Sequence, residues 1–305
     1  MGFVQPSPDP NWPSAATLLH PEAPPGRVVV GLLGAHTYRT SVTPRSATST
    51  PAAVREALER FSTWSHSDRL DLAEHVGVVD YGDVDDPDGD EGYARLARAV
   101  AGFDERLELR IFLGGDNALT WHALRALAGD GLSSYGLITL DAHLDMRDGV
   151  SNGSPVRQLL DEGLDGRHVV QVGLADFSNS PYYARQAKAH HVTVISRDKA
   201  RRRSIEEIAE RALKVAGEGG RRIYVDIDVD AADRSVAPGC PAAAPGGFSA
   251  DEMRRFVRAF ASHPQVRAMD ITEIDVERDG DDQRTVRLAA VLLLEALSGV
   301  VRREA

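Results

Sequence analysis

Short apolar runs alternate along this chain with longer segments of helical periodicity. The runs are apolar at nearly every position, which is typical of strands buried on both faces of a parallel sheet. We therefore predict eight strands, over residues 28–33, 76–79, 107–113, 135–140, 168–172, 192–195, 223–227 and 266–271. Helices are predicted between them, over residues 51–61, 93–101, 118–128, 204–216, 249–261 and 285–300.

This alternation of strands and helices predicts an α/β fold with three layers, α/β/α, around a mainly parallel eight-stranded sheet. Residues 1–26 are rich in Pro, Ser and Ala and show no clear period. We expect them to form a loosely ordered N-terminal arm, and residues 27–305 to form a single domain.

Charge and cysteine content limit the possible partners and compartment. The formal net charge is −11, which argues against a nucleic-acid partner, because such proteins need a basic face. Cys240 is the one cysteine in the sequence, as expected in a reducing compartment. The N-terminus has no signal-peptide pattern, and the apolar stretch 288–301 is too short to cross a bilayer. We expect a cytoplasmic protein that has no membrane partner.

Acidic and amide side chains gather where four of the predicted strands end. In parallel α/β sheets, ligands bind outside the carboxyl ends of the strands. Asn117 follows the third predicted strand, Asp141, His143 and Asp145 follow the fourth, and Asp226 and Asp228 end the seventh. Residues two apart at a strand end point to the same side, so each group should converge on one patch.

Such a gathering of carboxylates is a candidate metal site. A single Asp-x-Asp at a strand end is often only a cap or a surface pair, but two such groups, each after a buried strand, favour metal binding. Unpaired buried carboxylates would repel each other, and divalent cations remove that cost. Carboxylates with one imidazole suit Mn²⁺ or Mg²⁺ better than Zn²⁺. If Asp141 and Asp226 bridge, two metals can bind and activate a water molecule.

Four motifs resemble the ureohydrolase superfamily, the family of the arginases and agmatinases. They are GGDN (114–117), LDAHLD (140–145), DIDVDAADRSVAPGCPAAAPGG (226–247) and MDITEID (269–275), and the resemblance covers about residues 27–301. It implies an α/β/α fold, two Mn²⁺ ions per chain and hydrolysis of a C–N bond in an amidine or guanidine. It also implies a homo-oligomer.

The resemblance also implies roles for individual residues. One metal would be held by the residues at positions 117, 141, 145 and 226, which are Asn117, Asp141, Asp145 and Asp226. The other would be held by Asp141, His143, Asp226 and Asp228. Asp145 and Glu273 would be catalytic, and Glu273 would also bind the amidine nitrogens of the substrate.

The chain departs from the family pattern at two places. Asn117 stands where the family usually has His, so we expect weaker binding of the metal at that position. The loop over residues 151–155 lacks the His that arginases and agmatinases use for proton transfer.

That loop, with residues 171–192 and 233–242, is similar to the formimidoylglutamases of histidine degradation. The similarity implies conversion of N-formimidoyl-L-glutamate and water to L-glutamate and formamide. The loop residues Asn152 and Ser154 would contact the substrate, and Arg45 and Arg157 are candidates to bind its two carboxylates. Two alternatives stay open. One is an agmatinase or another guanidino-acid hydrolase, and the other is a metal-poor, non-catalytic binding or regulatory relative, which the replaced His at position 117 suggests.

Overall fold

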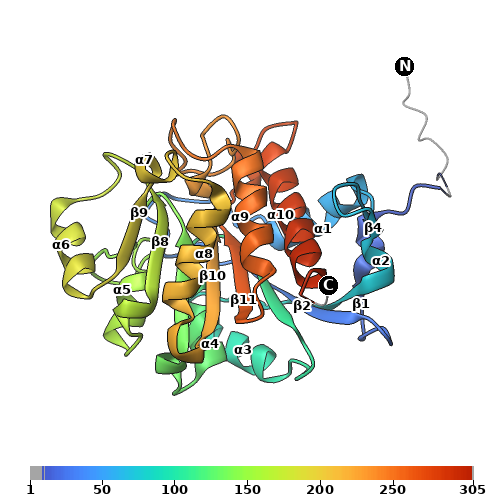
Figure 1. Ribbon diagram of the computed structural model, residues 1–305, viewed down its shortest axis with the longest axis horizontal. Helices are drawn as coiled ribbons and strands as arrows, with labels where there is room; N and C mark the ends of the chain where they lie inside the picture. Colours follow the sequence, from blue (N-terminus) through green and yellow to red (C-terminus); the bar gives the residue numbers. More distant parts are fainter. Residues whose placement is uncertain (1–8, 10, 304–305) are drawn as a thin grey trace.

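Nine parallel strands form the central sheet of the molecule (Figure 1). The computed structural model describes residue 9 and residues 11–303. The strand order is β1-β5-β2-β6-β11-β10-β7-β8-β9. The bounds are β1 (Leu19–His20), β2 (Val28–Ala35), β5 (Val76–Asp83), β6 (Leu109–Gly114), β7 (Tyr135–Leu140), β8 (Val169–Leu174), β9 (Thr193–Ser196), β10 (Arg222–Asp228) and β11 (Val266–Thr272). The eight predicted strands are all present in this sheet.

The ninth strand, β1, comes from the segment predicted to be a loose arm. Leu19 of β1 pairs with Val78 of β5, and the turn before it, η1 (Ala15–Leu18), buries Ala15 and Leu18. The prediction is therefore wrong for this part of the segment, while residues 1–8 and 10 lie outside the described residues. A two-residue strand after one helical turn is too short to show a hydrophobic period.

Helices cover both faces of the sheet, as the predicted three-layer fold requires (Figure 1). One face carries α1 (Thr50–Ala57), α8 (Ile205–Ala216), α9 (Ala250–Ala261) and α10 (Arg284–Val301). The other face carries α3 (Gly89–Ala101), α4 (Ala118–Ala128), α5 (Pro155–Asp161) and α6 (Pro181–Ala189). The six predicted helices are confirmed, whereas α5 and α6 were not predicted.

Smaller elements connect these layers. They are the helices α2 (Leu72–His75) and α7 (Arg197–Ala200), the antiparallel pair β3 (Trp64–Ser65) and β4 (Leu70–Asp71), and turns of 3₁₀ helix at Leu58–Arg60, Leu132–Ser134, Gly166–His168, Glu218–Gly220, Val229–Ala231 and Val276–Arg278. None of the helices that the structure describes is both long and apolar enough to cross a bilayer.

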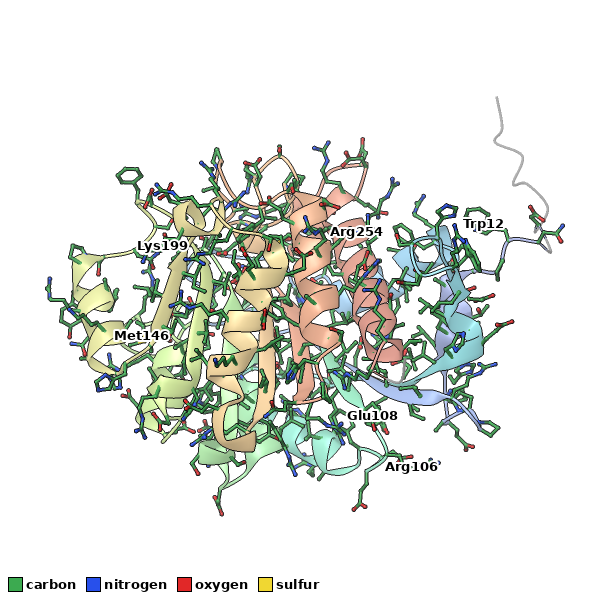
Figure 2. The ribbon with its side chains drawn as sticks, in the orientation of Figure 1. Trp12, Arg106, Glu108, Met146, Lys199 and Arg254 are labelled. Atoms are coloured by element: carbon green, nitrogen blue, oxygen red, sulfur yellow. The ribbon has the colours of Figure 1, made fainter. Side chains whose placement is uncertain are left out.

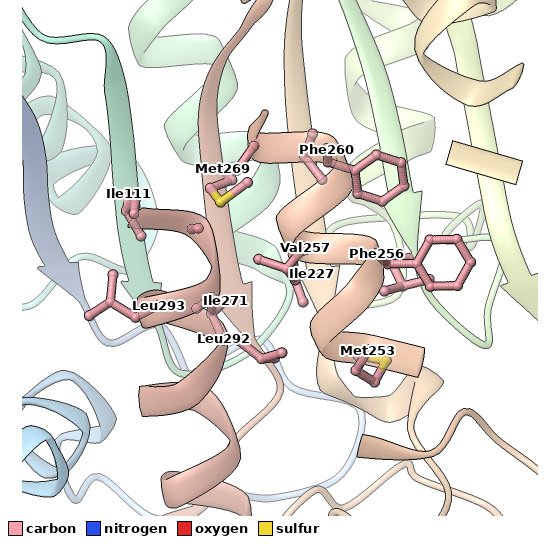
Figure 3. Packing of buried hydrophobic residues seen from close by; sticks show 14 of the residues in the cluster. Ile111, Ile227, Met253, Phe256, Val257, Phe260, Met269, Ile271, Leu292 and Leu293 are labelled. Atoms are coloured by element: carbon pink, nitrogen blue, oxygen red, sulfur yellow. The ribbon is translucent and has the colours of Figure 1, made fainter. Parts of the chain in front are cut away.

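Aromatic and aliphatic side chains fill the space between the sheet and α9 (Figure 3). Phe256 and Phe260 of α9 are fully buried, with their ring centroids 5.7 Å apart, and they belong to the same apolar cluster as Ile227 of β10. Burying one such side chain stabilises the fold by about 1.5–3 kcal/mol. On the outer side of α9, Arg254 (Figure 2) forms a 2.8 Å ion pair with Glu295 of α10. These contacts fix the central strands, and with them the residues at their carboxyl ends.

Candidate active site

The predicted site residues meet at the carboxyl ends of four central strands. Because β6, β11, β10 and β7 are neighbours and parallel, their carboxyl ends lie on the same edge of the sheet. Asn117 follows β6, Asp141 follows β7 and Glu273 follows β11, while Asp228 ends β10. The sheet therefore brings together residues that lie as far apart as positions 117 and 273.

Three carboxylates form the centre of the site. Oxygen atoms of Asp141, Asp145 and Asp226 all lie within 4.8 Å of one another, and all three residues are buried. Asp228 is also buried, and its carboxylate lies in a second group with Cys240 and Glu273. Burial, reinforced by the neighbouring carboxylates, raises the pKa of Asp141, Asp226 and Asp228 well above the usual range of an aspartate.

Two oxygen atoms in this cluster fit a cation. Asp141 Oδ2 and Asp226 Oδ1 are buried and have no hydrogen-bond partner among the described residues. An unpaired buried carboxylate oxygen is costly, and a divalent cation is the ligand that removes the cost for several such atoms at once. The oxygen-rich donor set suits Mn²⁺ or Mg²⁺. These two residues are the ones predicted to bridge two metals.

His143 contacts a carboxylate that was not among the predicted site residues. Its Nδ1 lies 2.6 Å from Asp230 Oδ2, and the other oxygen of Asp230 accepts a hydrogen bond from the backbone N–H of Ala142. Although burial disfavours the protonated ring, the charge of Asp230 raises the pKa of His143 to about 9. Asp230 therefore orients the one imidazole of the predicted ligand set.

Asn117 lies directly beside the carboxylate cluster. Its Nδ2 donates a 2.6 Å hydrogen bond to Asp145, and its Oδ1 accepts hydrogen bonds from the hydroxyls of Thr120 and Thr272. The Thr120 hydroxyl also lies 2.9 Å from Asp270 and has only one proton to donate. It can therefore donate to only one of these two oxygens, and the NH2 group of Asn117, not its carbonyl oxygen, faces the carboxylates of Asp145 and Asp226.

Glu273 is held by three partners. Its carboxylate forms a buried ion pair with Arg45 and accepts hydrogen bonds from Asn152 Nδ2 (2.9 Å) and from the backbone N–H of Asn117 (3.0 Å). Glu273 and Asp145 both have positive φ values, 66° and 51°, which are uncommon for residues other than glycine. Such backbone conformations persist where the surrounding structure fixes them, often at functional sites.

A pocket of about 490 Å³ opens above these residues. Six predicted site residues line it: Arg45, His143, Asp145, Asn152, Asp228 and Glu273. Asn117, Asp141 and Asp226 are buried and are not among its lining residues. The pocket thus gives a small molecule access to the carboxylate cluster from one side.

Comparison with known proteins identifies the family. The model of the arginase family matches residues 29–299, which is most of the chain. The chain belongs to the arginase family.

Two formimidoylglutamases are similar to this chain over most of its length. The formimidoylglutamase of Bacillus subtilis is 33% identical over 281 residues, which cover 88% of this chain and 86% of that protein. The formimidoylglutamase of Halalkalibacterium halodurans is 34% identical over 280 residues, with the same coverage. The crystal structure of the B. subtilis protein superposes with a TM-score of 0.88 and covers 99% of this chain and 96% of that one, at 29% identity.

Two residues predicted to bind substrate take other positions in this arginase-family fold. Ser154 is buried, and its hydroxyl bonds within the loop, to the backbone oxygen and nitrogen of Ser151. Arg157 pairs with Asp148 and Asp161 at 3.1 and 2.8 Å. Neither residue is among those that line the pocket. Both lie in or near α5, a helix that was not predicted, so their direction could not be inferred from sequence.

Sequence reasoning did not select two residues that the structure places at the site. Asp230 continues the alternation of Asp226 and Asp228, so its spacing was a signal for it. Arg147 lines the pocket two positions after Asp145, and the same i, i+2 spacing could have indicated it. Cys240 is fully buried, and burial raises the pKa of its thiol well above the usual value, which argues against a nucleophilic thiolate.

Proposed function

We propose that this protein is a formimidoylglutamase, which hydrolyses N-formimidoyl-L-glutamate to L-glutamate and formamide with the help of Mn²⁺. The observation that carries the proposal is the pair of buried, unpartnered carboxylate oxygens on Asp141 and Asp226 beneath a pocket that contains arginines. The formimidoylglutamases that are 33% and 34% identical over most of their length support this choice of substrate.

Two Mn²⁺ ions would be held by the predicted ligands. Asp141 and Asp226 would contact both ions, Asn117 and Asp145 one of them, and His143 and Asp228 the other. The ions would lower the pKa of a water molecule and so supply the nucleophile near neutral pH. A solved relative, the formiminoglutamase of Trypanosoma cruzi with Mn²⁺, superposes with a TM-score of 0.85 at 24% identity, a likeness that concerns the fold.

The protein's own residues would bind and orient the substrate. Glu273 faces the pocket, and its carboxylate would accept hydrogen bonds from the amidine nitrogens. Water adds to the amidine carbon, and the bond from that carbon to the glutamate nitrogen then breaks. Asp145 belongs to the carboxylate cluster and also lines the pocket. Its carboxylate can therefore take the proton of the attacking water and return it to the departing amine.

The cationic groups of the pocket favour an anionic substrate. Agmatine carries a cation at its far end, which Arg45 and Arg147 would repel, whereas a guanidino acid carries a carboxylate there. A guanidino-acid hydrolase is therefore the alternative enzyme. A non-catalytic relative is the alternative of another class, because Asn117 replaces a stronger imidazole ligand.

A side-by-side turnover assay tests the proposal. The Mn²⁺-loaded protein is given formimidoylglutamate, agmatine, arginine or guanidinobutyrate, and the release of formamide and urea is measured. We expect formamide from formimidoylglutamate alone. Release of urea from guanidinobutyrate but no formamide would replace the proposed substrate by a guanidino acid. Absence of turnover together with absence of bound metal would favour the non-catalytic alternative.

We further propose a cytoplasmic homo-oligomer in which residues 27–305, together with η1 and β1, form one domain. The family resemblance supports the oligomer, and the single cysteine supports a reducing compartment. Light scattering coupled to size-exclusion chromatography measures the mass of the assembly directly. A mass equal to one 33.0 kDa chain at all concentrations would contradict the oligomer.

A further inference from the structure

We propose that Arg147 binds the side-chain carboxylate of the substrate and that Gly153 sets the position of its guanidinium. This inference rests on the proposed function, because it assigns a specificity residue for N-formimidoyl-L-glutamate. The substrate has two carboxylates, one on the carbon that carries the amidine nitrogen and one at the end of the side chain. Each needs a partner with positive charge or hydrogen-bond donors.

The pocket contains two arginines, and only one of them has its charge free. Arg45 forms an ion pair with Glu273, and both side chains are almost fully buried, at 1% and 2% exposure. Arg147 also lines the pocket, yet its guanidinium forms no ion pair or hydrogen bond with any residue that the structure describes. Its residue is exposed, so the guanidinium lies at the mouth of the pocket rather than at its base.

The two arginines lie at different depths in the pocket, and the two carboxylates of a bound substrate would do the same. The carboxylate next to the amidine stays close to the bond that breaks, and therefore close to Glu273 and Arg45 at the base of the pocket. The side-chain carboxylate lies two methylene groups further away, towards the mouth. Arg147 is the arginine at that end. Arg157, which the sequence suggested together with Arg45 as a partner for the two carboxylates, already pairs with Asp148 and Asp161.

Contacts with Gly153 position the side chain of Arg147. The backbone N–H of Arg147 donates a 3.0 Å hydrogen bond to the Gly153 oxygen, which closes the loop between them. A Cβ at Gly153 would lie 2.7 Å from Arg147 Cδ and 3.1 Å from Arg147 Nε, so the arginine side chain lies directly over the glycine. Gly153 is not among the residues with positive φ, so its backbone would accept alanine and the added methyl group would act on Arg147.

A pair of substrates that differ only at the distal group tests this assignment. N-formimidoyl-L-glutamine has a neutral amide in place of the side-chain carboxylate. We expect Arg147→Met to lower kcat/KM for formimidoylglutamate by about 10- to 100-fold, as for loss of a charge-assisted hydrogen bond, mainly through KM. The same variant should change kcat/KM for the glutamine analogue little. Arg147→Lys should restore part of the loss, and Gly153→Ala should show the same substrate dependence with a smaller effect.

Two further variants complete the experiment. Arg167→Met is the matched control, because Arg167 is exposed and pairs only with neighbouring Asp165 among the described carboxylates. Arg157→Met tests the rival assignment. Equal losses for both substrates in Arg147→Met, or a loss confined to formimidoylglutamate in Arg157→Met, would overturn the role of Arg147.

A binding measurement separates this inference from the proposed function. If wild-type protein releases no formamide from formimidoylglutamate, the proposed function fails. Calorimetric titration of the Mn²⁺-loaded protein with L-glutamate and with L-glutamine then still tests Arg147. We expect tighter binding of glutamate and loss of that difference in Arg147→Met. An unchanged difference in the variant would overturn the inference on its own.

Discussion

Single residues of this site act through the partners that they contact. Asp230 illustrates this. It was not predicted as a site residue, yet its Oδ2 lies 2.6 Å from Nδ1 of His143. Histidines that bind metals commonly donate their other ring N–H to such a group, which fixes the ring and raises its basicity. The residues that support the ligands are therefore as much a part of the site as the ligands.

Replacing Asp230 should weaken the metal centre without removing a predicted ligand. We expect Asp230→Asn to lower Mn²⁺ affinity or activity by roughly 10- to 100-fold, which is typical for the group behind a metal-bound histidine. The Mn²⁺ concentration at half-maximal activity gives the measure, with Asp233→Asn, in the same segment but outside the carboxylate cluster and the pocket lining, as the control. A metal dependence equal to that of wild type would show that Asp230 has no such role.

A substitution at Asn117 should instead strengthen the binding of Mn²⁺. Imidazole is a stronger donor to Mn²⁺ than an amide oxygen. We expect Asn117→His to lower the Mn²⁺ concentration needed for half-maximal activity, by roughly tenfold if the change is comparable to that of other groups around a bound metal. A titration of activity with Mn²⁺ measures it. If the midpoint does not move, Asn117 does not bind the metal.

At the level of elements, the outer contacts of α10 decide how firmly this helix covers the sheet. Asp68, in the loop between β3 and β4, accepts a 2.5 Å hydrogen bond from Ser298 of α10 and pairs with Arg302. Although burial opposes the charged form, these partners lower the pKa of Asp68 from 3.8 to about 2. The carboxylate therefore links the C-terminal helix to a loop far away in sequence.

The pKa of Asp68 predicts a pH-dependent contribution to stability. A carboxylate whose folded pKa is depressed stabilises the fold above its unfolded pKa, and this stabilisation is lost as pH falls through the folded value. We expect Asp68→Asn to reduce the free energy of unfolding by about 1–2 kcal/mol at pH 7, allowing for screening at the half-exposed Arg302. Urea unfolding at several pH values measures this. The difference from wild type should shrink between about pH 4 and pH 2, and a constant difference would contradict the prediction.

The elements also show what the sequence could and could not reveal. Strands such as β7 and β10 were predicted because burial on both faces makes them apolar at most positions, and their ends then located Asp141 and Asp226. The helix α5 was missed because it has only 7 residues, and α6 was missed because it buries a single residue, Ala187. Arg147 stands two positions after Asp145, but this spacing alone does not reveal the loop that places its side chain over Gly153.

At the scale of the whole molecule, the carboxylate cluster makes stability depend on metal. The raised pKa values of Asp141, Asp226 and Asp228 reflect a cost of burying negative charge, and bound cations would remove it. The buried carboxylates that would bind the ions therefore destabilise the metal-free protein.

Removal of metal should lower the melting temperature. A ligand at about 100 times its Kd stabilises the native state by about 2.7 kcal/mol. A chelator removes the metal and, with it, this stabilisation. We expect Mn²⁺ to raise Tm over the value in EDTA, and Asp226→Asn to abolish the shift while leaving the metal-free protein at least as stable as wild type. Calorimetry with and without EDTA measures both. A shift that survives in Asp226→Asn would place the responsible ion elsewhere.

The strand order has a consequence for how the chain is made. β6 and β7 follow each other in sequence, but β11 and β10 lie between them in the sheet. While the ribosome has released only the first 220 residues or so, the middle of the sheet is missing, and one edge each of β6 and β7 has no partner. Open strand edges invite pairing with other chains. The segment that carries Asp226, Asp228 and Glu273 thus closes this gap and completes the site in one step, so a chain truncated before β10 would be prone to aggregate as well as inactive.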